Sequence, residues 1–271
     1  MHVFLHDSFA RQLRLGRLRK GDSRLFVVPL DHSVSTGPVV RDGRLDDLVE
    51  QIGTNGADAV VLHKGSLRRV DPRRFGTLSL IVHLSASTAH AADPDAKVLV
   101  ATVEEALSLG ADAVSVHVNL GSAQEGRQIA DLATVAGACH RWGVPLLAMV
   151  YPRGPRLHDP ADPDLVAHAA ALAAELGADL VKTVFPGSAQ AMADVARSCP
   201  IPILVAGGPT GPADDDLFGR LHDAVRGGAA GVAVGRHVFA SANPAAVVSK
   251  ISGLVHDAAL ADPHETTGGR A

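Results

Sequence analysis

Short hydrophobic segments alternate with longer amphipathic segments along most of the chain. The amphipathic segments, such as 45–52 and 165–176, have the hydrophobic spacing of helices that pack against a core. A glycine-led phrase follows such segments four times, at residues 56–60 (GADAV), 110–114 (GADAV), 177–181 (GADLV) and, more loosely, 228–232 (GAAGV). This pattern predicts helices that end at a left-handed glycine and are followed directly by a strand.

Four further strands are expected between the glycine-led phrases and before the first one. The glycines of successive phrases are separated by 54, 67 and 51 residues, which leaves room for two strand–helix units each. The hydrophobic segments that fit are 25–30 (LFVVPL), 78–84 (LSLIVHL), 145–150 (PLLAMV) and 201–205 (IPILV). Eight short strands alternating with helices favour a (β/α)8 TIM barrel, and the first strand is not followed by the G-x-G-x-x-G phrase of a Rossmann fold.

We therefore predict an α/β protein with a single domain over residues 1–271. The barrel is expected over about residues 22–256, after an amino-terminal helix over 8–18. A tail over about residues 262–271 is expected to be disordered.

Composition narrows the classes of function. The chain has 271 residues, 46% of them hydrophobic and 20% charged, and a formal net charge of −4. Because no basic surplus is available for a phosphate backbone, we expect no nucleic-acid partner. Two cysteines provide no disulfide framework and no metal cluster, and no hydrophobic run has the length of a membrane span. We therefore expect a cytoplasmic protein that contacts no membrane.

Polar residues follow the expected strands at their carboxyl ends, where barrel enzymes have their active sites. Gly207 and Gly208 follow the seventh expected strand, and Gly235 and Arg236 follow the eighth. Glycines there let backbone N–H groups approach an anion closely, and an arginine adds a charged donor. The pattern predicts a phosphate site and a small phosphorylated substrate, with glycines that merely turn the chain as the alternative.

One of the few lysines lies in a hydrophobic strand segment: Lys182, within residues 179–184 (DLVKTV). A lysine there is expected to point into a polar barrel mouth, where partial desolvation favours the neutral amine that attacks a carbonyl. This predicts a Schiff-base lysine, with a lysine held by a buried carboxylate as the alternative. Lys20, Lys97 and Lys250 lie in basic, polar or terminal helical segments, and we expect their side chains to be solvated.

Two other side chains could move protons near Lys182. Tyr151, the single tyrosine of the chain, stands just past the fifth expected strand, beside the strand that carries Lys182. Its phenol can transfer a proton, or it is a core ring with a satisfied hydroxyl. Asp31 ends the first expected strand and is a base, a lysine partner or a cap for the following loop.

Three histidines offer a metal-dependent alternative. His63, His83 and His117 fall on the second, third and fourth expected strands, and three imidazoles around a barrel mouth can bind zinc. Because His83 and His117 are followed by further strand residues, we favour histidines packed inside the barrel. No metal site is therefore expected at these histidines.

Several of these segments resemble the archaeal-type class I aldolases, and the resemblance spans about residues 8–256. The segments that carry it are 28–38 (VPLDHSVSTGP), 81–88 (IVHLSAST), 115–122 (SVHVNLGS), 149–154 (MVYPRG), 179–183 (DLVKT), 206–209 (AGGP) and 231–236 (GVAVGR). The first of them is similar to the branch of the family that uses aspartate semialdehyde, whereas the fructose-bisphosphate aldolases tend to have Asp-Gln-Gly there. The resemblance implies a (β/α)8 enzyme that forms a Schiff base, needs no cofactor and assembles as a homo-oligomer, a decamer in the family.

The resemblance also implies roles for individual positions. It places the Schiff-base lysine at Lys182, the proton donor at Tyr151 and the proton acceptor at Asp31. The implied phosphate-binding residues are Gly207, Gly208, Gly235 and Arg236, and the implied substrate-contacting residues are His32, Ser33, Val34, Ser35, Pro152 and Arg153.

The implied reaction joins dihydroxyacetone phosphate to L-aspartate 4-semialdehyde, toward 3-amino-4-hydroxybenzoate in secondary metabolism. The alternatives are the transaldol reaction of the same branch, which feeds another route to aromatic compounds, and fructose-bisphosphate cleavage. The α-carboxylate of the semialdehyde needs a cation, and Arg153 is the nearest in sequence to Tyr151. Pairing of Arg153 with Asp159 or Asp162 is the competing interpretation. A metal-dependent enzyme and a catalytically silent metabolite sensor are the rival classes of function.

Overall fold

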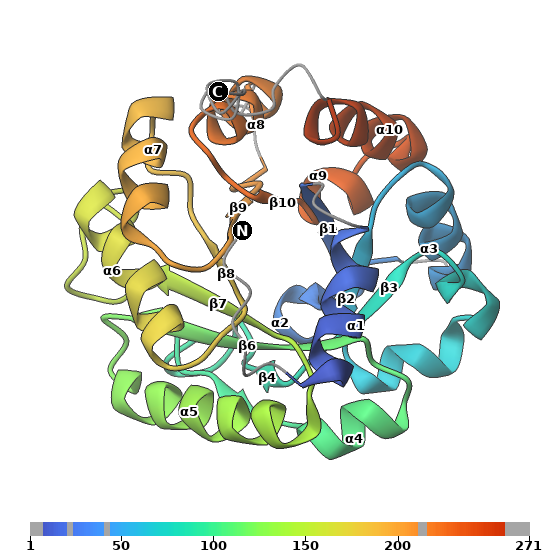
Figure 1. Ribbon diagram of the computed structural model, residues 1–271, viewed down its shortest axis with the longest axis horizontal. Coiled ribbons are helices and arrows are strands. Elements are labelled where there is room, and N and C mark those ends of the chain that lie inside the picture. Colours follow the sequence, from blue (N-terminus) through green and yellow to red (C-terminus); the bar gives the residue numbers. More distant parts are fainter. Residues whose placement is uncertain (1–7, 21–23, 41–43, 211–215, 258–271) are drawn as a thin grey trace, which may run out of the picture.

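The strands close into a parallel barrel (Figure 1). The computed structural model describes residues 8–20, 24–40, 44–210 and 216–257. Around the barrel the strand order is β1-β10-β9-β8-β7-β6-β3-β2, and β2 pairs with β1 to complete the ring. The eight strands are β1 (Leu25–Pro29), β2 (Ala59–Leu62), β3 (Ser79–His83), β6 (Ala113–Leu120), β7 (Leu146–Pro152), β8 (Leu180–Thr183), β9 (Ile203–Ala206) and β10 (Gly231–Ala233). The predicted (β/α)8 barrel is confirmed.

Helices surround this ring in Figure 1 and follow the strands in the expected alternation. The α-helices are α1 (Phe9–Arg19), α2 (His32–Thr36), α3 (Leu45–Thr54), α4 (Val103–Ser108), α5 (Glu125–Trp142), α6 (Pro163–Glu175), α7 (Ala189–Ser198), α8 (Leu217–Arg226), α9 (Arg236–Phe239) and α10 (Pro244–Val255). Two 3-10 helices, η1 (Lys64–Arg69) and η2 (Pro72–Phe75), lie between β2 and β3. The predicted disordered tail over about 262–271 lies outside the described residues.

The glycine-led phrases form the turns between helices and strands, as predicted. Their first glycines adopt the left-handed backbone conformation that side chains with a Cβ rarely enter. The φ angles are 99° at Gly56, 87° at Gly110, 88° at Gly177 and 88° at Gly228. Each of these helices ends two residues before its glycine, and the next strand begins three residues after it.

The aspartates of three phrases, called the floor carboxylates here, join neighbouring strands. Each accepts a hydrogen bond from a backbone N–H near the start of the adjacent strand. Asp58 accepts from Phe26 at 2.8 Å, Asp112 from Leu80 at 3.0 Å and Asp179 from Leu146 at 2.7 Å. In the fourth and loosest phrase Ala230 stands at this position. The repeated motif therefore has a structural role: its aspartates connect neighbouring strands at the amino-terminal end of the barrel.

Helix α1 covers this amino-terminal end and pairs with the same three carboxylates. The ion pairs are Arg11–Asp179 at 2.6 Å, Arg17–Asp112 at 3.6 Å and Lys20–Asp58 at 3.0 Å. Between them, Leu15 and Leu18 pack against the hydrophobic cluster inside the barrel. The predicted helix over 8–18 is thus confirmed, and it closes the floor of the barrel.

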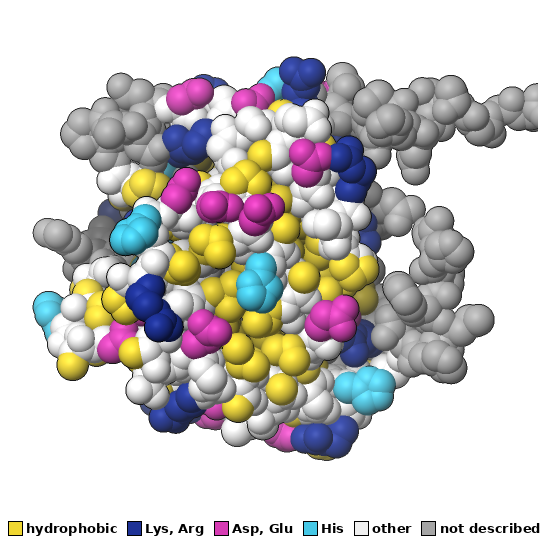
Figure 2. All heavy atoms as spheres, turned by 90° about the vertical axis from the view of Figure 1, so that its left-hand side faces the viewer, with side chains coloured by type: hydrophobic (Ala, Val, Ile, Leu, Met, Phe, Trp, Pro, Cys, Tyr) yellow, Lys and Arg dark blue, Asp and Glu magenta, His cyan; other side chains and the backbone are white. Residues whose placement is uncertain are grey.

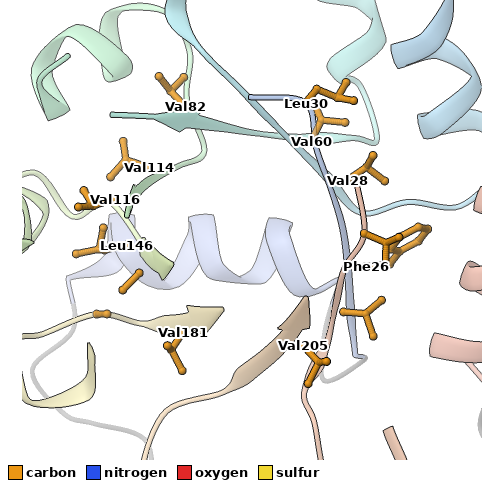
Figure 3. Close-up of a cluster of buried hydrophobic side chains, with 14 of the residues drawn as sticks. Phe26, Val28, Leu30, Val60, Val82, Val114, Val116, Leu146, Val181 and Val205 are labelled. Carbon is orange, nitrogen blue, oxygen red and sulfur yellow. The ribbon is translucent and has the colours of Figure 1, made fainter. Parts of the chain in front are cut away.

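The hydrophobic core has two layers. One lies inside the barrel, where residues such as Val27, Ile81 and Leu147 meet. The other lies between the strands and the surrounding helices. Side chains of this outer layer, for example Val82 and Val205, point away from the barrel axis in Figure 3. Alternate residues of each strand thus face the two layers, and the inward positions near the carboxyl ends are left for polar side chains.

The segment after β3 differs from the prediction. The third strand was expected over residues 78–84, and β3 ends one residue earlier, at His83. Ser85–Ala86 forms a separate strand, β4, which pairs antiparallel with β5 (Val98–Leu99). Because β4 follows the carboxyl end of β3, this hairpin lies beside the barrel mouth, the carboxyl-terminal end of the ring.

The outer surface carries interspersed charged and hydrophobic side chains on the face of α6 and α7 (Figure 2). Neither sign of charge covers this face, in keeping with the small net charge of −4. No helix in the described part of the chain combines the length and hydrophobicity that a bilayer crossing requires.

Candidate active site

Three polar side chains predicted to be catalytic lie at the barrel mouth. Asp31 follows β1, Tyr151 lies on β7, and Lys182 lies on the adjacent strand β8. Met149 pairs with Lys182 in the sheet, so Tyr151, two residues further on the same face of β7, lies nearer the mouth. Tyr151 is therefore part of its strand rather than just past it. The Lys182 Nζ lies 5.7 Å from the centroid of the Tyr151 ring.

The Lys182 amine is buried, with 7% of the residue exposed. Among the described residues its Nζ forms no hydrogen bond and has no carboxylate oxygen within 4 Å; its recorded contact is with the face of the Tyr151 ring. The alternative of a lysine held by a buried carboxylate is therefore wrong for these residues. An amine without a hydrogen-bonding partner remains accessible to a carbonyl carbon at the mouth.

Asp31 lies among histidines and is only slightly exposed. Its Oδ2 is 3.8 Å from the Nε2 of His83, and its Oδ1 is 3.7 Å from the Nδ1 of His32. Burial by itself raises the pKa of Asp31, but His83, His32 and Lys182 together hold this pKa well below its usual value. Burial also lowers the pKa of His83 to about 4 and that of His32 below its usual value. Three groups around Asp31 thus favour its ionised form in spite of its burial.

Several polar atoms at the barrel mouth form no hydrogen bond to a described residue. Asp31 Oδ1 and His32 Nδ1 are buried without a hydrogen bond in the described segments. Asp31 precedes α2 but makes no side-chain capping bond, so its interpretation as a cap is wrong. The Tyr151 hydroxyl also forms no hydrogen bond to a described residue. Buried polar atoms are rarely left unsatisfied unless a ligand, ion or water completes them, so the mouth has the character of a ligand site.

The three histidines of the metal alternative are engaged with protein groups. His83 Nδ1 is 2.8 Å from Ser115 Oγ, and His117 Nε2 is 2.8 Å from Asn119 Oδ1. The His63 ring lies edge-on to the His83 ring, with centroids 5.3 Å apart. Burial lowers the pKa of each of the three imidazoles. Over the described ranges, no group of three or more His, Cys, Asp or Glu side chains has a geometry that could hold a metal ion.

Helix α2 contains four of the predicted substrate-contacting residues, His32, Ser33, Val34 and Ser35. His32 contacts Asp31, as described above. The Ser33 Oγ accepts a hydrogen bond from the backbone N–H of Val39 and so holds the turn after the helix. Val34 is 38% exposed. The structure thus brings His32 to the carboxylate and gives Ser33 a local structural contact, while their contacts with substrate stay predictions.

Pro152 and Arg153, which follow Tyr151 in the sequence, have different surroundings. Strand alternation places Pro152 on the face away from Tyr151, where it is buried. The Arg153 Nε lies 3.9 Å from Asp95 Oδ1. Pairing with Asp159 or Asp162 is wrong, because those carboxylates accept hydrogen bonds from nearby backbone N–H groups.

The two glycine-containing loops of the predicted phosphate site lie side by side. The Arg236 guanidinium donates to the Gly208 carbonyl at 2.7 Å, and Gly208 has a φ of 79°. The Gly207 N–H donates to the Ala233 carbonyl, so it belongs to the sheet rather than to a ligand cradle. Arg220 Nη2, on α8, lies 3.3 Å from the Gly207 carbonyl oxygen. Arg220 is thus a second arginine at these loops, and the sequence offered no signal for it.

Gly235 brings the last loop against the first one. A Cβ at Gly235 would lie 2.4 Å from the Pro29 carbonyl oxygen and 3.0 Å from His32 Cε1. Any side chain would therefore push the loop away from the segment that carries Asp31 and His32. The close approach explains a glycine here and places Gly235 against the segment that carries Asp31 and His32.

One expectation about the lysines is wrong. Lys97 was expected to be solvated because it lies in a polar stretch, but it is 9% exposed. Its Nζ donates to the Ser87 hydroxyl and to the Pro94 carbonyl. No pattern in the sequence marks this lysine as buried, since the contacts come from the loop of the unexpected β4–β5 hairpin.

Known proteins of similar sequence belong to one kind of enzyme. The family model described as DeoC/LacD family aldolase matches residues 25–241. A Streptomyces griseus protein named 2-amino-4,5-dihydroxy-6-oxo-7-(phosphonooxy)heptanoate synthase is 58% identical over 250 residues, which cover 92% of this chain and 91% of that protein. A Halobacterium salinarum protein named 2-amino-3,7-dideoxy-D-threo-hept-6-ulosonate synthase is 43% identical over 249 residues, covering 90% and 91%.

Solved structures give the same result. A crystal structure of an archaeal fructose 1,6-bisphosphate aldolase superposes with a TM-score of 0.82 at 27% identity and covers 91% of this chain and 99% of that one. Another structure of an archaeal aldolase of this specificity, with its catalytic lysine bound covalently to the carbinolamine intermediate, has a TM-score of 0.79 at 26% identity, covering 91% and 100%. Barrel, sequence and family model agree: this chain is an aldolase and belongs to the DeoC/LacD family.

Proposed function

We propose that this chain is a Schiff-base aldolase that condenses dihydroxyacetone phosphate with L-aspartate 4-semialdehyde. The product is 2-amino-4,5-dihydroxy-6-oxo-7-(phosphooxy)heptanoate, which leads toward 3-amino-4-hydroxybenzoate. The observation that carries the proposal is the buried Lys182 amine, which has no hydrogen bond among the described residues and lies 5.7 Å from the Tyr151 ring. The choice of substrates is supported by the 58% identity to the Streptomyces griseus synthase.

The reaction begins with attack of the Lys182 amine on the ketone carbon of dihydroxyacetone phosphate. Loss of water gives a cationic iminium, which makes the neighbouring hydroxymethylene carbon acidic. Tyr151 or Asp31 removes a proton from this carbon, and the resulting enamine attacks the aldehyde carbon of aspartate semialdehyde. The new alkoxide takes up a proton, and water hydrolyses the iminium to release the product and the free lysine. Atoms and charges balance without a metal or organic cofactor.

The low pKa of Asp31 fits the part of a carboxylate that stays ionised at neutral pH. It can stabilise the iminium at Lys182 and accept a proton while the cation is present. The Tyr151 phenol, with its ring against the lysine, can deliver or accept the proton at the reacting carbon. Both residues can therefore transfer the proton in the proposed site, and Asp31 also stabilises the cation.

The predicted phosphate site comprises Gly207, Gly208, Gly235 and Arg236, and the phosphate of the donor is proposed to bind at the last three. The structure refines this set, because the Gly207 N–H is used within the sheet and Arg236 already holds the Gly208 carbonyl. Arg236 then orders the loop and supplies charge at the same place. Helix α9 begins at Arg236, directly after its N-cap residue Gly235, whose carbonyl accepts from the Val238 and Phe239 N–H groups.

Replacement of Arg236 by alanine is expected to raise the KM for dihydroxyacetone phosphate about tenfold or more, since one charge-assisted contact is lost. Unphosphorylated dihydroxyacetone has no charge for this guanidinium, so its kcat/KM should change much less. Steady-state kinetics with both donors check this. Arg197→Ala, on the outer helix α7 where Arg197 pairs with Asp194, is the matched control. Equal losses with both donors would assign Arg236 a structural role.

The proposed substrate pair is tested by purified enzyme, dihydroxyacetone phosphate and two competing aldehydes. Aspartate semialdehyde should react at least about tenfold better in kcat/KM than glyceraldehyde 3-phosphate, because polar groups left unpaired in a dry site cost several kcal/mol. Mass spectrometry should identify the seven-carbon amino acid phosphate. Preference for glyceraldehyde 3-phosphate would make the protein a fructose-bisphosphate aldolase. Reaction confined to a 6-deoxy-5-ketofructose phosphate donor would select the dideoxyheptulosonate branch.

The assembly of the protein stays a prediction. Family resemblance implies a homo-oligomer, a decamer in the family, while the structure holds one chain. A homo-oligomer is therefore part of the proposal and not of the description above.

A further inference from the structure

Lys97 is a buried cation that the proposed mechanism does not use. It is 9% exposed, and its Nζ donates to two neutral acceptors, Ser87 Oγ and the Pro94 carbonyl oxygen. Among the described residues, no carboxylate oxygen lies within 4 Å of this ammonium. Burial lowers the pKa of Lys97, and the nearby Arg153 lowers it further. A buried ammonium without a counter-ion is costly, so an anion that completes it would stabilise the charged form.

Hydrogen bonds hold the segment of Lys97 against the strand next to Tyr151. The Asp95 carbonyl accepts from Asn119 Nδ2 at 2.8 Å and from Gln128 Nε2 at 3.2 Å. Asn119 lies on β6 and pairs directly with Tyr151 of β7 in the sheet. These bonds fix the backbone at Asp95, two residues before Lys97. Lys97 therefore has a defined position beside the proposed reacting centre.

The charge of Lys97 acts on other residues of the barrel mouth. Burial, and after it the Lys97 charge, lower the pKa of His117 well below its usual value. The His117 ring packs against the Tyr151 ring, with centroids 5.0 Å apart. Asp31, across the mouth, acts in the opposite direction and favours the charged form of Lys97. Asn119, which holds the Asp95 carbonyl, also has its Oδ1 2.8 Å from His117 Nε2, so the segment that carries Lys97 is tied to the ring that packs against Tyr151.

Two more charges flank Lys97. Arg153, which follows Tyr151, has its Nε 3.9 Å from Asp95 Oδ1, a separation too long for a tight ion pair. The Arg153 side chain is 59% exposed and the Asp95 side chain 24% exposed. Asp93 is a second carboxylate near Lys97, and its Oδ1 accepts a hydrogen bond from the Asp95 backbone N–H at 3.0 Å. Two cations and two carboxylates thus lie on one side of the mouth. This arrangement is complementary to a small zwitterion, whose carboxylate would meet the cations and whose ammonium would meet Asp95.

We propose that Lys97 and Arg153 bind the α-carboxylate of the acceptor aldehyde, that Asp95 binds its α-ammonium, and that these three residues select an amino-acid aldehyde. The inference rests on the proposed function and adds the residues that recognise its acceptor. Asp95 disfavours glyceraldehyde 3-phosphate, because this aldehyde has no ammonium to pair with the carboxylate and its phosphate would be repelled by it.

The test uses three aldehydes with dihydroxyacetone phosphate as donor. Aspartate semialdehyde has both charged groups, succinate semialdehyde has the carboxylate alone, and butanal has neither. In Lys97→Met the kcat/KM should fall about 10- to 30-fold for both semialdehydes, mainly through KM, since a charge-assisted contact is removed. The value for butanal should stay within about threefold. Lys97→Arg should restore part of the loss, because the positive charge is kept.

Asp95→Asn tests the other half of the site independently. Its kcat/KM should fall for aspartate semialdehyde by about tenfold and change little for succinate semialdehyde, which has no ammonium. Lys64→Met is the matched control for the lysine, because Lys64 pairs with Glu105 on η1 and α4, outside the barrel mouth. Borohydride trapping of the donor at Lys182 should be unchanged in every variant, which separates acceptor binding from damage to the site.

The outcomes distinguish this inference from the proposed function. If the wild type makes no product from aspartate semialdehyde, the proposed function fails and the inference fails with it. If the wild type does make product but Lys97→Met loses the same factor with butanal, Lys97 merely holds its loop and the inference is overturned. Unchanged kinetics with all three aldehydes would overturn it as well. Should Lys97→Met fail to fold by circular dichroism, the Asp95→Asn comparison decides.

Discussion

Lys182→Met is expected to lower turnover by about 10⁴-fold or more, because the nucleophile of the proposed covalent intermediate is removed. Methionine fills nearly the same volume in a site where the lysine is 7% exposed, so the barrel should remain folded. The same position should be labelled in the wild type. Borohydride with dihydroxyacetone phosphate should reduce the imine to a secondary amine and add one reduced substrate to the peptide that contains Lys182.

The trapping experiment has a direct control. Lys250 lies on α10, with its Nζ 3.7 Å from the centroid of the Phe218 ring, and Lys250→Met should be labelled as the wild type is. Label on Lys64 or Lys97, or inactivation without label, would contradict the assignment of Lys182. Loss of label together with loss of the circular dichroism signal would show that the variant is unfolded, and Lys182→Arg would then replace it.

Tyr151→Phe is expected to slow carbon–carbon bond formation by about 10²-fold or more, since the ring stays in place but the proton is lost. The Lys182 and His117 contacts involve the face of the ring rather than its hydroxyl, so packing should be preserved. Trapping of the donor by borohydride should therefore continue at a rate close to that of the wild type. Product formation and trapping are measured on the same preparation.

A Tyr151→Phe enzyme with full activity would make Tyr151 a packing residue and leave proton transfer to Asp31. Loss of trapping would mean that the hydroxyl acts already in imine formation. The melting temperature separates both results from misfolding. The Tyr151 ring packs against the interior cluster of the barrel, so loss of the ring would lower the melting temperature, whereas loss of the hydroxyl alone would not.

The barrel could be predicted from the sequence because its signals are local. The glycine that follows a helix, an aspartate and the start of the hydrophobic strand occur within five residues, as in 110–114. The aspartate of this motif, Asp112, bonds to the preceding strand β3 at Leu80. Lys182 was found in the same way, since a lysine inside a hydrophobic strand segment conflicts with its surroundings unless it faces a polar site. The resemblance then indicated the same residue.

The acceptor side of the mouth could not be predicted, because its contacts are distant in sequence. Asp159 and Asp162 were considered as partners of Arg153 because they are close to it in sequence. The carboxylate beside Arg153 is Asp95, which is separated from it in the sequence by β6 and α5. Burial of Lys97 depends on Asn119, which holds the Asp95 carbonyl from 24 residues away. The β4–β5 hairpin has two-residue strands, too short for a hydrophobic pattern to show.

The closed floor of the barrel has a consequence for synthesis of the chain. Arg11 emerges from the ribosome first, but its partner Asp179 follows 168 residues later. At about 5–20 residues per second, translation of that interval takes roughly 10–30 s. Throughout this time Leu15 and Leu18 have no barrel interior to enter. The helix that is made first is thus among the last to reach its native place, and its hydrophobic face stays available to chaperones or to other nascent chains until the ring above it has closed.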